Sequence, residues 1–466
     1  MMKRIFLFSY TILLILLLTI TIDRIRIIES PKSNLPNFKK TIEANFFNFK
    51  LESKSIGSKT EAILVAAQPK SKLNDLVFTA NRATKDISVY KYGDKSVNLI
   101  QKFNFDTLIN QNRNDSNFLF DIELDKKRLL VSYVSVPQFY NSCDSFQIVK
   151  IPIQNDALEI NKISLVWRSG VCVHSYPNNV TWHDFQGRMA ISDQFIYLTA
   201  GLVIAATYDG YYPSKNFYGL NQDLREQIQI NQLFGGVTQI NKVTGKSSRF
   251  AEGFRGPSGI TIREMGDKEE IFVSDHGPRG GDELNLIRKG GNYGWPWVSY
   301  GRDYFELRTN KPKGFIKTKF ATHIGYDAPL YYWTPSIAPS QISVIKSDLD
   351  KYSSWAKGDL VLTTLKDKSI YRLKIINGSI LSSERVFLGA RIRDIAVTDT
   401  RIYVTTDDGR LISLVVSDIA TTDFAFPPIT TDGSPFYYRL PILHQFSVLI
   451  DLFWVKADEV VRKIFK

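Results

Sequence analysis

The chain has 466 residues, 44% hydrophobic and 13% aromatic, which excludes a disordered chain and suits a large core of packed sheets. Its formal net charge of +12 would permit binding to nucleic acid or to an anionic surface. However, basic residues are dispersed among acidic ones and no nucleic-acid-binding motif occurs. We therefore expect no nucleic-acid partner and favour a local basic pocket for an acidic small molecule.

Residues 1–28 are predicted to be a signal anchor or a signal peptide. Two basic residues precede an uncharged run, Ile5 to Ile22, which is near the lower limit for spanning a bilayer. The run is longer than the apolar part of a typical signal peptide, and no small-residue cleavage site follows it. We favour an uncleaved anchor over a cleaved signal peptide, and either would place the rest of the chain in the periplasm or on the extracytoplasmic face.

Residues 29–57 are polar and contain two prolines, so they are predicted to link the membrane segment to a folded domain at 58–420. Within that domain, short β-rich runs such as "RLLVSYVSV" and "RIYVTTDDG" are separated by turn residues, and no long helical period or alternation of strands with helices occurs. The pattern indicates an all-β fold and favours a β-propeller over a single sandwich.

The extension at 421–466 ends in "QFSVLIDLFWVKADEVVRKIFK", in which apolar residues recur at helical spacing. We expect an amphipathic helix that either docks on its own domain or lies on the membrane. The two cysteines, Cys143 and Cys172, are compatible with a disulfide in an oxidising compartment, or with two buried thiols.

A dense glycine-rich motif lies in the second half of the domain. "HGPRGGDELN" at 276–285 is followed by "GGNYGWPWVSYG" at 290–301, and further along the chain by "YYWTPSIAPS" and "ARIRDIAV". In this order and spacing, the motifs resemble the soluble pyrroloquinoline-quinone-dependent sugar dehydrogenases, the glucose/sorbosone or aldose sugar dehydrogenase family. The resemblance covers roughly residues 60 to 416. It implies a six-bladed propeller that binds the quinone (PQQ) with Ca²⁺ on its top face.

The resemblance also implies which residues bind the cofactor. Lys366, Arg391 and Arg393 match the family's lysine and paired arginines, and such cations suit the carboxylates of the quinone. Arg391 and Arg393 are separated by one residue, so strand alternation points both to the same face. Without the resemblance, a solvated edge strand would explain the pair. We also assign His276 to cofactor binding.

Calcium prefers oxygen ligands, often backbone carbonyls at sharp turns. By resemblance, Gly277 and Pro278 supply carbonyl oxygens to the calcium ion that contacts the cofactor. A separate structural calcium site is also implied by the resemblance, at Asp282, Glu283, Tyr293 and Asp303. The alternative for the acids among them is a hydrogen-bonded turn.

The implied reaction is oxidation of an aldose at its anomeric carbon. His183 lies upstream of a Gly-Arg pair, as the family's catalytic histidine does, and its near-neutral pKa suits a base. Arg255 matches the arginine that approaches the quinone oxygen. The other histidines, His174 and His323, have no such match and are expected to be structural or surface groups.

Several positions depart from the family pattern. One extra residue separates His183 from the Gly-Arg pair, Leu202 stands where an acid usually supports the histidine, and Asn81 stands where a glutamate is frequent. The segment usually written R-N-P-Q-G is "RGPSG" here, so Gly256 and Ser258 replace two polar residues.

These departures motivate a second hypothesis, a binding or scaffold propeller without turnover. A third, a metal-dependent hydrolase, would need several carboxylate or histidine ligands. We expect a sugar as the partner and a membrane-associated electron acceptor, but no segment specifies which sugar, since residues 203 to 232 resemble nothing known to us.

Overall fold

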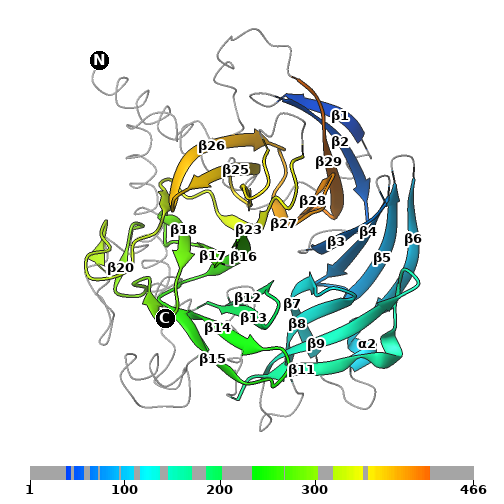
Figure 1. Cartoon of the computed structure of the whole chain (residues 1–466), viewed down its shortest axis with the longest axis horizontal. Coiled ribbons are helices and arrows are strands. Elements are labelled where there is room, and N and C mark those ends of the chain that lie inside the picture. The colour runs from blue at the N-terminus through cyan, green and yellow to red at the C-terminus, as the bar shows by residue number, and fades with distance from the viewer. Residues whose placement is uncertain are drawn as a thin grey trace, which may run out of the picture. The chain divides into compact units, whose positions relative to one another are not determined.

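The computed structural model of the chain describes residues 38–43, 47–56, 63–71, 74–93, 96–109, 116–136, 145–170, 185–201, 233–266, 268–302, 319–349 and 355–419. Their strands form six principal sheets that follow one another around a central axis (Figure 1). In ring order, the innermost strand of each sheet contacts the innermost strand of the next, and the sixth contacts the first. The predicted all-β, six-bladed propeller is confirmed.

The first three blades are built mainly from consecutive antiparallel strands, with β19 added in parallel to β15 at the outer edge of blade 3. Blade 1 contains β3 (Ile63–Ser71), β4 (Asn74–Asn81), β5 (Asp86–Gly93) and β6 (Val97–Asn104), followed by the short helix α2 (Phe105–Ile109). Blade 2 contains β7 (Ser116–Leu124), β8 (Arg128–Val136), β9 (Ser145–Gln154), β10 (Ala157–Leu158) and β11 (Ser164–Arg168), with a 3-10 turn at Ile160–Lys162. Blade 3 contains β12 (Gln186–Ile191), β13 (Phe195–Ala200), β14 (Gly236–Asn241), β15 (Ser247–Glu252) and β19 (Gly291–Asn292).

The remaining blades complete the ring. Blade 4 contains β16 (Pro257–Met265), β17 (Lys268–Asp275), β18 (Asp282–Ile287) and β22 (Tyr331–Trp333), and a small parallel pair, β20 (Val298–Ser299) and β21 (Lys319–Phe320), is inserted before β22. Blade 5 contains β23 (Pro339–Val344), β24 (Leu360–Thr364), β25 (Ser369–Ile376) and β26 (Ser379–Phe387). Blade 6 contains β27 (Ile392–Val397), β28 (Ile402–Thr406), β29 (Arg410–Ile419), β2 (Phe47–Ser55) and β1 (Phe38–Glu43).

Blade 6 is built from both ends of the folded chain. Strand β2 pairs antiparallel with β29, from Phe47 opposite Ile419 to Ser55 opposite Arg410, and β1 pairs with β2. Part of the stretch predicted as a linker at 29–57 therefore belongs to the propeller, and the domain starts before residue 58. The polar composition of this stretch did not indicate strands. An outer strand can be held by backbone pairing and does not require a run of apolar residues.

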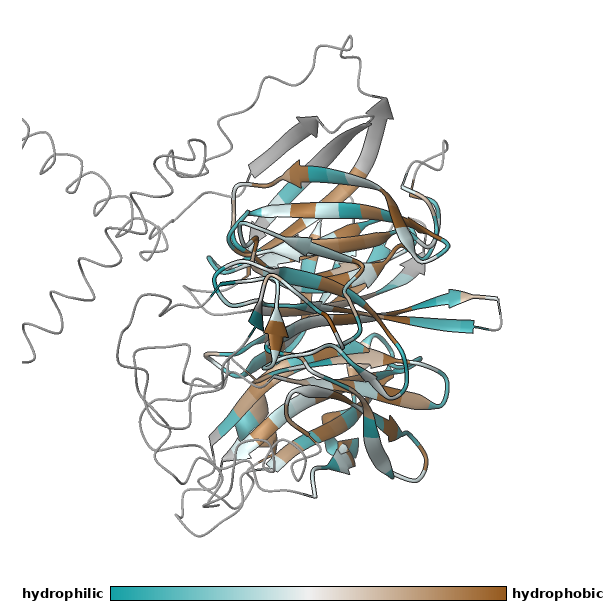
Figure 2. Ribbon diagram, turned by 90° about the vertical axis from the view of Figure 1, so that its left-hand side faces the viewer, coloured by the Kyte–Doolittle hydropathy of each residue, from teal (hydrophilic) through white to brown (hydrophobic). Residues whose placement is uncertain are grey.

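The hydrophobic core is divided among the blade interfaces. Each of six clusters of buried side chains joins two neighbouring blades, and the last joins blade 6 to blade 1 through Tyr403 and Tyr92, whose rings meet edge to face at 5.0 Å. Figure 2 shows apolar and polar residues alternating along the strands. Sheets that bury both faces against neighbours are stabilised by this apolar area, so the closed ring is the unit of stability.

The predicted anchor at 1–28, the cysteine pair and the extension at 421–466 lie outside the described residues. Within the described part of the chain, no helix has the length and apolar character needed to cross a membrane.

Candidate functional site

One rim of the ring gathers most of the residues singled out from the sequence. The first and second strands of each blade are antiparallel, so the loop after the second strand and the start of the first strand lie at the same rim. Lys366 follows β24 and the 276–281 turn follows β17, whereas Arg255 precedes β16 and Arg391 precedes β27. The topology alone therefore brings the predicted cofactor residues to one face.

The two predicted arginines converge on one carboxylate. Nε of Arg391 donates to Oδ2 of Asp407 at 2.8 Å, while Nε and Nη2 of Arg393 donate to Oδ1 and Oδ2 at 2.8 and 3.1 Å. Burial of Asp407 opposes its ionisation, but Arg393 and Arg391 outweigh burial and hold the pKa of Asp407 below its usual range. Both side chains thus reach the same carboxylate, and they are 37% and 21% exposed.

A bulge in β27 aids this convergence. Ile392 pairs with Thr406 and Asp394 with Thr405, so Arg393 is the extra residue of the strand. Lys366, in the loop of the adjacent blade, is exposed, and its backbone amide donates to the carbonyl oxygen of Ile337 at 3.1 Å. An ammonium and two guanidinium groups on one rim form a site suited to carboxylates.

The glycine-rich turn is held by a buried acid. Oδ1 of Asp282 accepts the Gly277 amide at 3.1 Å, and Oδ2 accepts three donors from the 336–338 segment: Ser336 Oγ at 2.6 Å and the amides of Ile337 and Ala338 at 2.8 and 2.7 Å. A Cβ at Gly277 would lie 2.2 Å from the carbonyl oxygen of Gly281, so only glycine fits there. Asp282 therefore acts through turn hydrogen bonds in this structure, the alternative weighed for the acids of the motif.

His276 begins this turn. Its Nε2 is hydrogen bonded to the carbonyl oxygen of Pro339, and its amide donates to Gly256 at 3.0 Å. Burial lowers the pKa of His276. The charges of Arg255 and Arg393 also lower it, whereas the charge of Asp282 raises it. The ring therefore joins blade 4 to blade 5 through its hydrogen bond to Pro339.

Arg255 lies under the same turn. Its Nη1 donates to the carbonyl oxygens of His276 at 3.0 Å and Gly277 at 3.4 Å, and its guanidinium lies 5.7 Å from the ring centroid of Trp295. Its Nε is buried without a hydrogen-bond partner in the described part of the chain. A buried guanidinium with a spare donor can hold a further oxygen atom.

Asp275 fixes the backbone that carries Arg255. Its carboxyl accepts the amides of Arg255 at 3.0 Å and Gly256 at 2.6 Å. Burial, aided by the charge of Glu283, raises the pKa of Asp275 to about 8.

The carbonyl oxygen atoms predicted to hold calcium each accept one hydrogen bond from the protein. Gly277 O faces Arg255, and Pro278 O accepts the amide of Arg302 at 3.0 Å. Each carbonyl oxygen has a second lone pair, so the turn offers two hard donors that fit calcium but do not complete its shell.

Two of the residues predicted for a structural calcium site, Glu283 and Tyr293, have other polar partners in the structure. Glu283 Oε1 is bonded to Nε2 of buried His323 at 2.9 Å, and Oε2 accepts from Asn285 at 3.3 Å. The Tyr293 hydroxyl donates to Leu286 O at 2.9 Å, and burial raises the pKa of Tyr293 to about 12. Among the described residues no group of three or more His, Cys, Asp or Glu could hold a metal ion.

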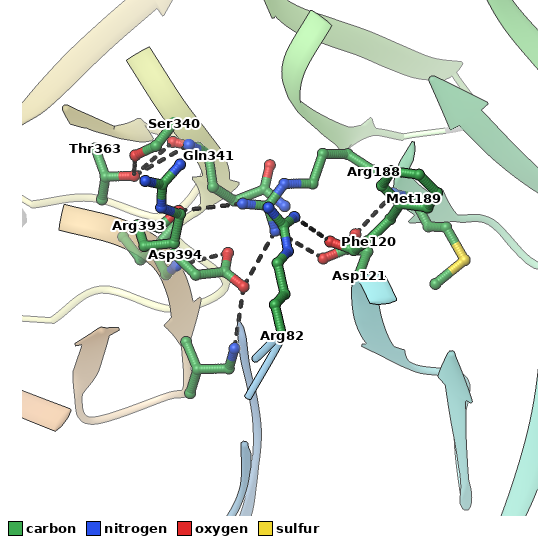
Figure 3. A network of polar contacts seen from close by, with 12 residues as sticks. Arg82, Phe120, Asp121, Arg188, Met189, Ser340, Gln341, Thr363, Arg393 and Asp394 are labelled. Carbon is green, nitrogen blue, oxygen red and sulfur yellow. Dashed lines mark hydrogen bonds and ion pairs between the residues drawn. The ribbon is translucent and has the colours of Figure 1, made fainter. Parts of the chain in front are cut away.

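Asp303, His183 and Leu202 lie outside the described residues. The Gly-Arg pair that follows His183 is described. Arg188 is 2% exposed and forms ion pairs with Asp121 at 2.8 Å and with Asp394 at 3.2 Å (Figure 3). The sequence motifs did not indicate this group of charges or Arg82. Arg188 belongs to the Gly-Arg pair and Asp394 to the motif "ARIRDIAV".

Comparison with known proteins identifies the family of the chain. The family model described as Glucose / Sorbosone dehydrogenase matches residues 120–413. The chain belongs to this family. Its aldose sugar dehydrogenase relative YliI from Escherichia coli K12 is 31% identical over 36% of this chain and 43% of the relative, and quinoprotein glucose dehydrogenase B from Acinetobacter calcoaceticus is 27% identical over 31% and 37%. The matched regions thus span less than half the length of these glucose/sorbosone dehydrogenase relatives.

Solved structures show the same fold. The soluble aldose sugar dehydrogenase of Escherichia coli in its apo form aligns with a TM-score of 0.55 and 20% identity, covering 79% of this chain and 99% of that structure. A glucose dehydrogenase structure aligns with a TM-score of 0.54 and 18% identity, covering 78% and 99%.

Proposed function

We propose that this family member oxidises an aldose or a related sugar at its anomeric carbon, with pyrroloquinoline quinone as the hydride acceptor and calcium beside it. The observation that carries the proposal is the pair Arg391 and Arg393, half-exposed and aimed to one side on the rim that also carries Lys366 and the 276–281 turn. Planar guanidinium forks bind carboxylates in pairs, which suits a cofactor with several carboxylates.

Different residues of this chain would bind the cofactor, bind calcium and stabilise the developing charge. Arg391, Arg393 and Lys366 would orient the cofactor through its carboxylates, and the carbonyl oxygens of Gly277 and Pro278 would bind calcium. Arg255 would direct its spare Nε to an oxygen on which negative charge grows. When bound, the quinone supplies a two-electron acceptor for the hydride of the anomeric carbon.

His183 would accept the proton of the anomeric hydroxyl, so the sugar leaves as the lactone. Its role rests on its place before the Gly187 and Arg188 pair in the sequence. Arg188 anchors the strand that follows His183, since its amide donates to Thr199 Oγ1 at 2.9 Å and its side chain is paired with two acids. A fixed strand start would help to position a base that precedes it in the sequence.

The membrane anchor, extracytoplasmic location and membrane-associated electron acceptor remain part of this proposal on sequence grounds. Expression of the full chain followed by membrane fractionation tests the anchor. Recovery in the membrane fraction, with release after removal of residues 1–28, is expected, and a soluble full-length chain would contradict an uncleaved anchor.

The full chain should be titrated with the quinone in calcium and again in chelator, and the complex then mixed with a panel of aldoses. We expect calcium-dependent binding and reduction of the bound quinone by at least one sugar. Arg393→Met should weaken binding at least tenfold, whereas Arg128→Met, which removes an exposed arginine of blade 2, should not. Binding without reduction would favour the scaffold hypothesis, and no binding would reject the proposed cofactor.

A further inference from the structure

A buried arginine near the ring axis, Arg82, forms no ion pair with an acid in the described part of the chain. Arg82 follows β4 and is 2% exposed. Its Nη2 donates to the carbonyl oxygen of Phe120, its Nε has no hydrogen-bond partner, and none of the ion pairs in the described part of the chain includes it. A buried charge without a partner is strongly destabilising, so such a group normally faces an opposite charge.

The surroundings of Arg82 add positive charge. Figure 3 shows its guanidinium in the same region as that of Arg188, and Arg393 lies nearby on β27. Burial first, and then the charges of Arg188 and Arg393, hold the pKa of Arg82 well below its usual value. The nearby acids Asp121 and Asp394 are already bonded to Arg188.

The acids of the axis do not balance its cations. Burial raises the pKa of Asp121 to about 6, so this carboxyl is ionised at pH 7.5. Burial also raises the pKa of Glu123 well above its usual range, and Glu123 forms no ion pair with these arginines in the described part of the chain. Asp407 is shared by two arginines. The guanidinium groups compared are those of Arg82, Arg188, Arg391 and Arg393, and the carboxylates are those of Asp121, Asp394 and Asp407. One guanidinium is thus left without an ionised counterpart.

We propose that Arg82 forms an anion subsite at the axis, which takes a carboxylate or a small inorganic anion of similar size. Its unpaired Nε and the adjacent cations supply donor and charge, and the burial of Arg82 excludes water, so that a charge-assisted hydrogen bond is strong there. This inference rests on described side chains and stands without the proposed cofactor. If the quinone does bind, one of its carboxylates is a natural occupant, because Arg393 belongs to both sites.

The test is thermal unfolding of the full chain without quinone at pH 7.5, titrated with formate or chloride at constant ionic strength maintained by a bulky sulfonate. We expect a saturable rise of the unfolding midpoint of about 2 °C or more. Arg82→Met should abolish the rise, Arg82→Lys should retain part of it, and Arg128→Met should leave it unchanged. If the Met variant does not fold, the wild-type titration and the Lys variant still decide.

The source of the anion follows from a second titration. If a quinone carboxylate fills the subsite, the quinone-bound protein no longer responds to formate, and Arg82→Met weakens quinone binding at least tenfold. If an inorganic anion fills it, the formate response persists and quinone affinity changes less than twofold. A formate response without any quinone binding would support the subsite and reject the proposed function. No saturable response together with unchanged quinone affinity would overturn the subsite.

Discussion

Arg188 connects the first strand of blade 3 to the first strand of blade 6 by donating from Nη2 to the backbone carbonyl oxygen of Arg393 at 3.1 Å. The same guanidinium is paired with Asp394 of β27 and Asp121 of β7. The arginine after the predicted catalytic histidine thereby holds the backbone of an arginine predicted to bind the cofactor. Two parts of the proposed site are fixed by one buried side chain.

Arg188→Met should lower the free energy of unfolding by about 3–5 kcal/mol, because it leaves Asp121 and Asp394 buried without their shared cation. Urea unfolding measures the change. Arg128→Met removes an exposed guanidinium 3.9 Å from Asp125, which keeps Lys242 as a partner at 2.9 Å, and should change stability by less than about 0.5 kcal/mol. Equal effects of the two substitutions would contradict a structural role for the axial pair.

Asp407→Asn tests the shared carboxylate of Arg391 and Arg393. The folded pKa of Asp407 is depressed, so its ionisation stabilises the fold above the unfolded value of 3.8, and this contribution is lost as pH falls through the folded value. The variant should be less stable than the wild type by about 1 kcal/mol at pH 7, with a smaller difference at pH 3. Urea unfolding at both pH values checks this, and a difference that grows on acidification would exclude it.

The sequence motifs predicted the fold class and the rim, but not the partners of the charged residues. The spacing of Arg391 and Arg393 predicted one face for both, and in the structure their side chains reach the same carboxylate. Their partner Asp407 follows Arg393 by 14 residues and belongs to the next turn, so the pairing depends on the bulged register of β27 and β28. Side-chain alternation carries no information about such a register.

Long-range pairing explains the misplaced start of the domain. Strand β2 joins β29 across most of the chain length, and no local pattern in residues 47–55 encodes a partner near residue 415. The axial pair of Arg188 and Asp394 was hidden for the same reason, since the two residues come from blades 3 and 6.

Asp275→Asn should reveal a pH-dependent cost of burying this carboxyl. Because the folded pKa is raised to about 8 from an unfolded value near 3.8, its contribution is fully present below pH 3.8 and is lost as pH rises through the folded value. The stability of the wild type relative to the variant should therefore fall by about 1 kcal/mol or more between pH 5 and pH 7. Urea unfolding at the two pH values measures this difference. A relative gain for the wild type would show that Arg255 and the two bound amides favour the ionised form.

Gly277→Ala should disrupt the turn that is proposed to bind calcium. The added Cβ would lie 2.2 Å from Gly281 O and 2.3 Å from Gly280 O, and these backbone atoms cannot rotate away as a side chain would. We expect a loss of about 1–3 kcal/mol in the free energy of unfolding and weaker calcium-dependent quinone binding. Gly170→Ala is the matched control, since its Cβ would meet nothing within 4 Å. Urea unfolding and quinone titration measure both variants, and a Gly277 variant as stable as the control would mean that the turn relaxes without loss.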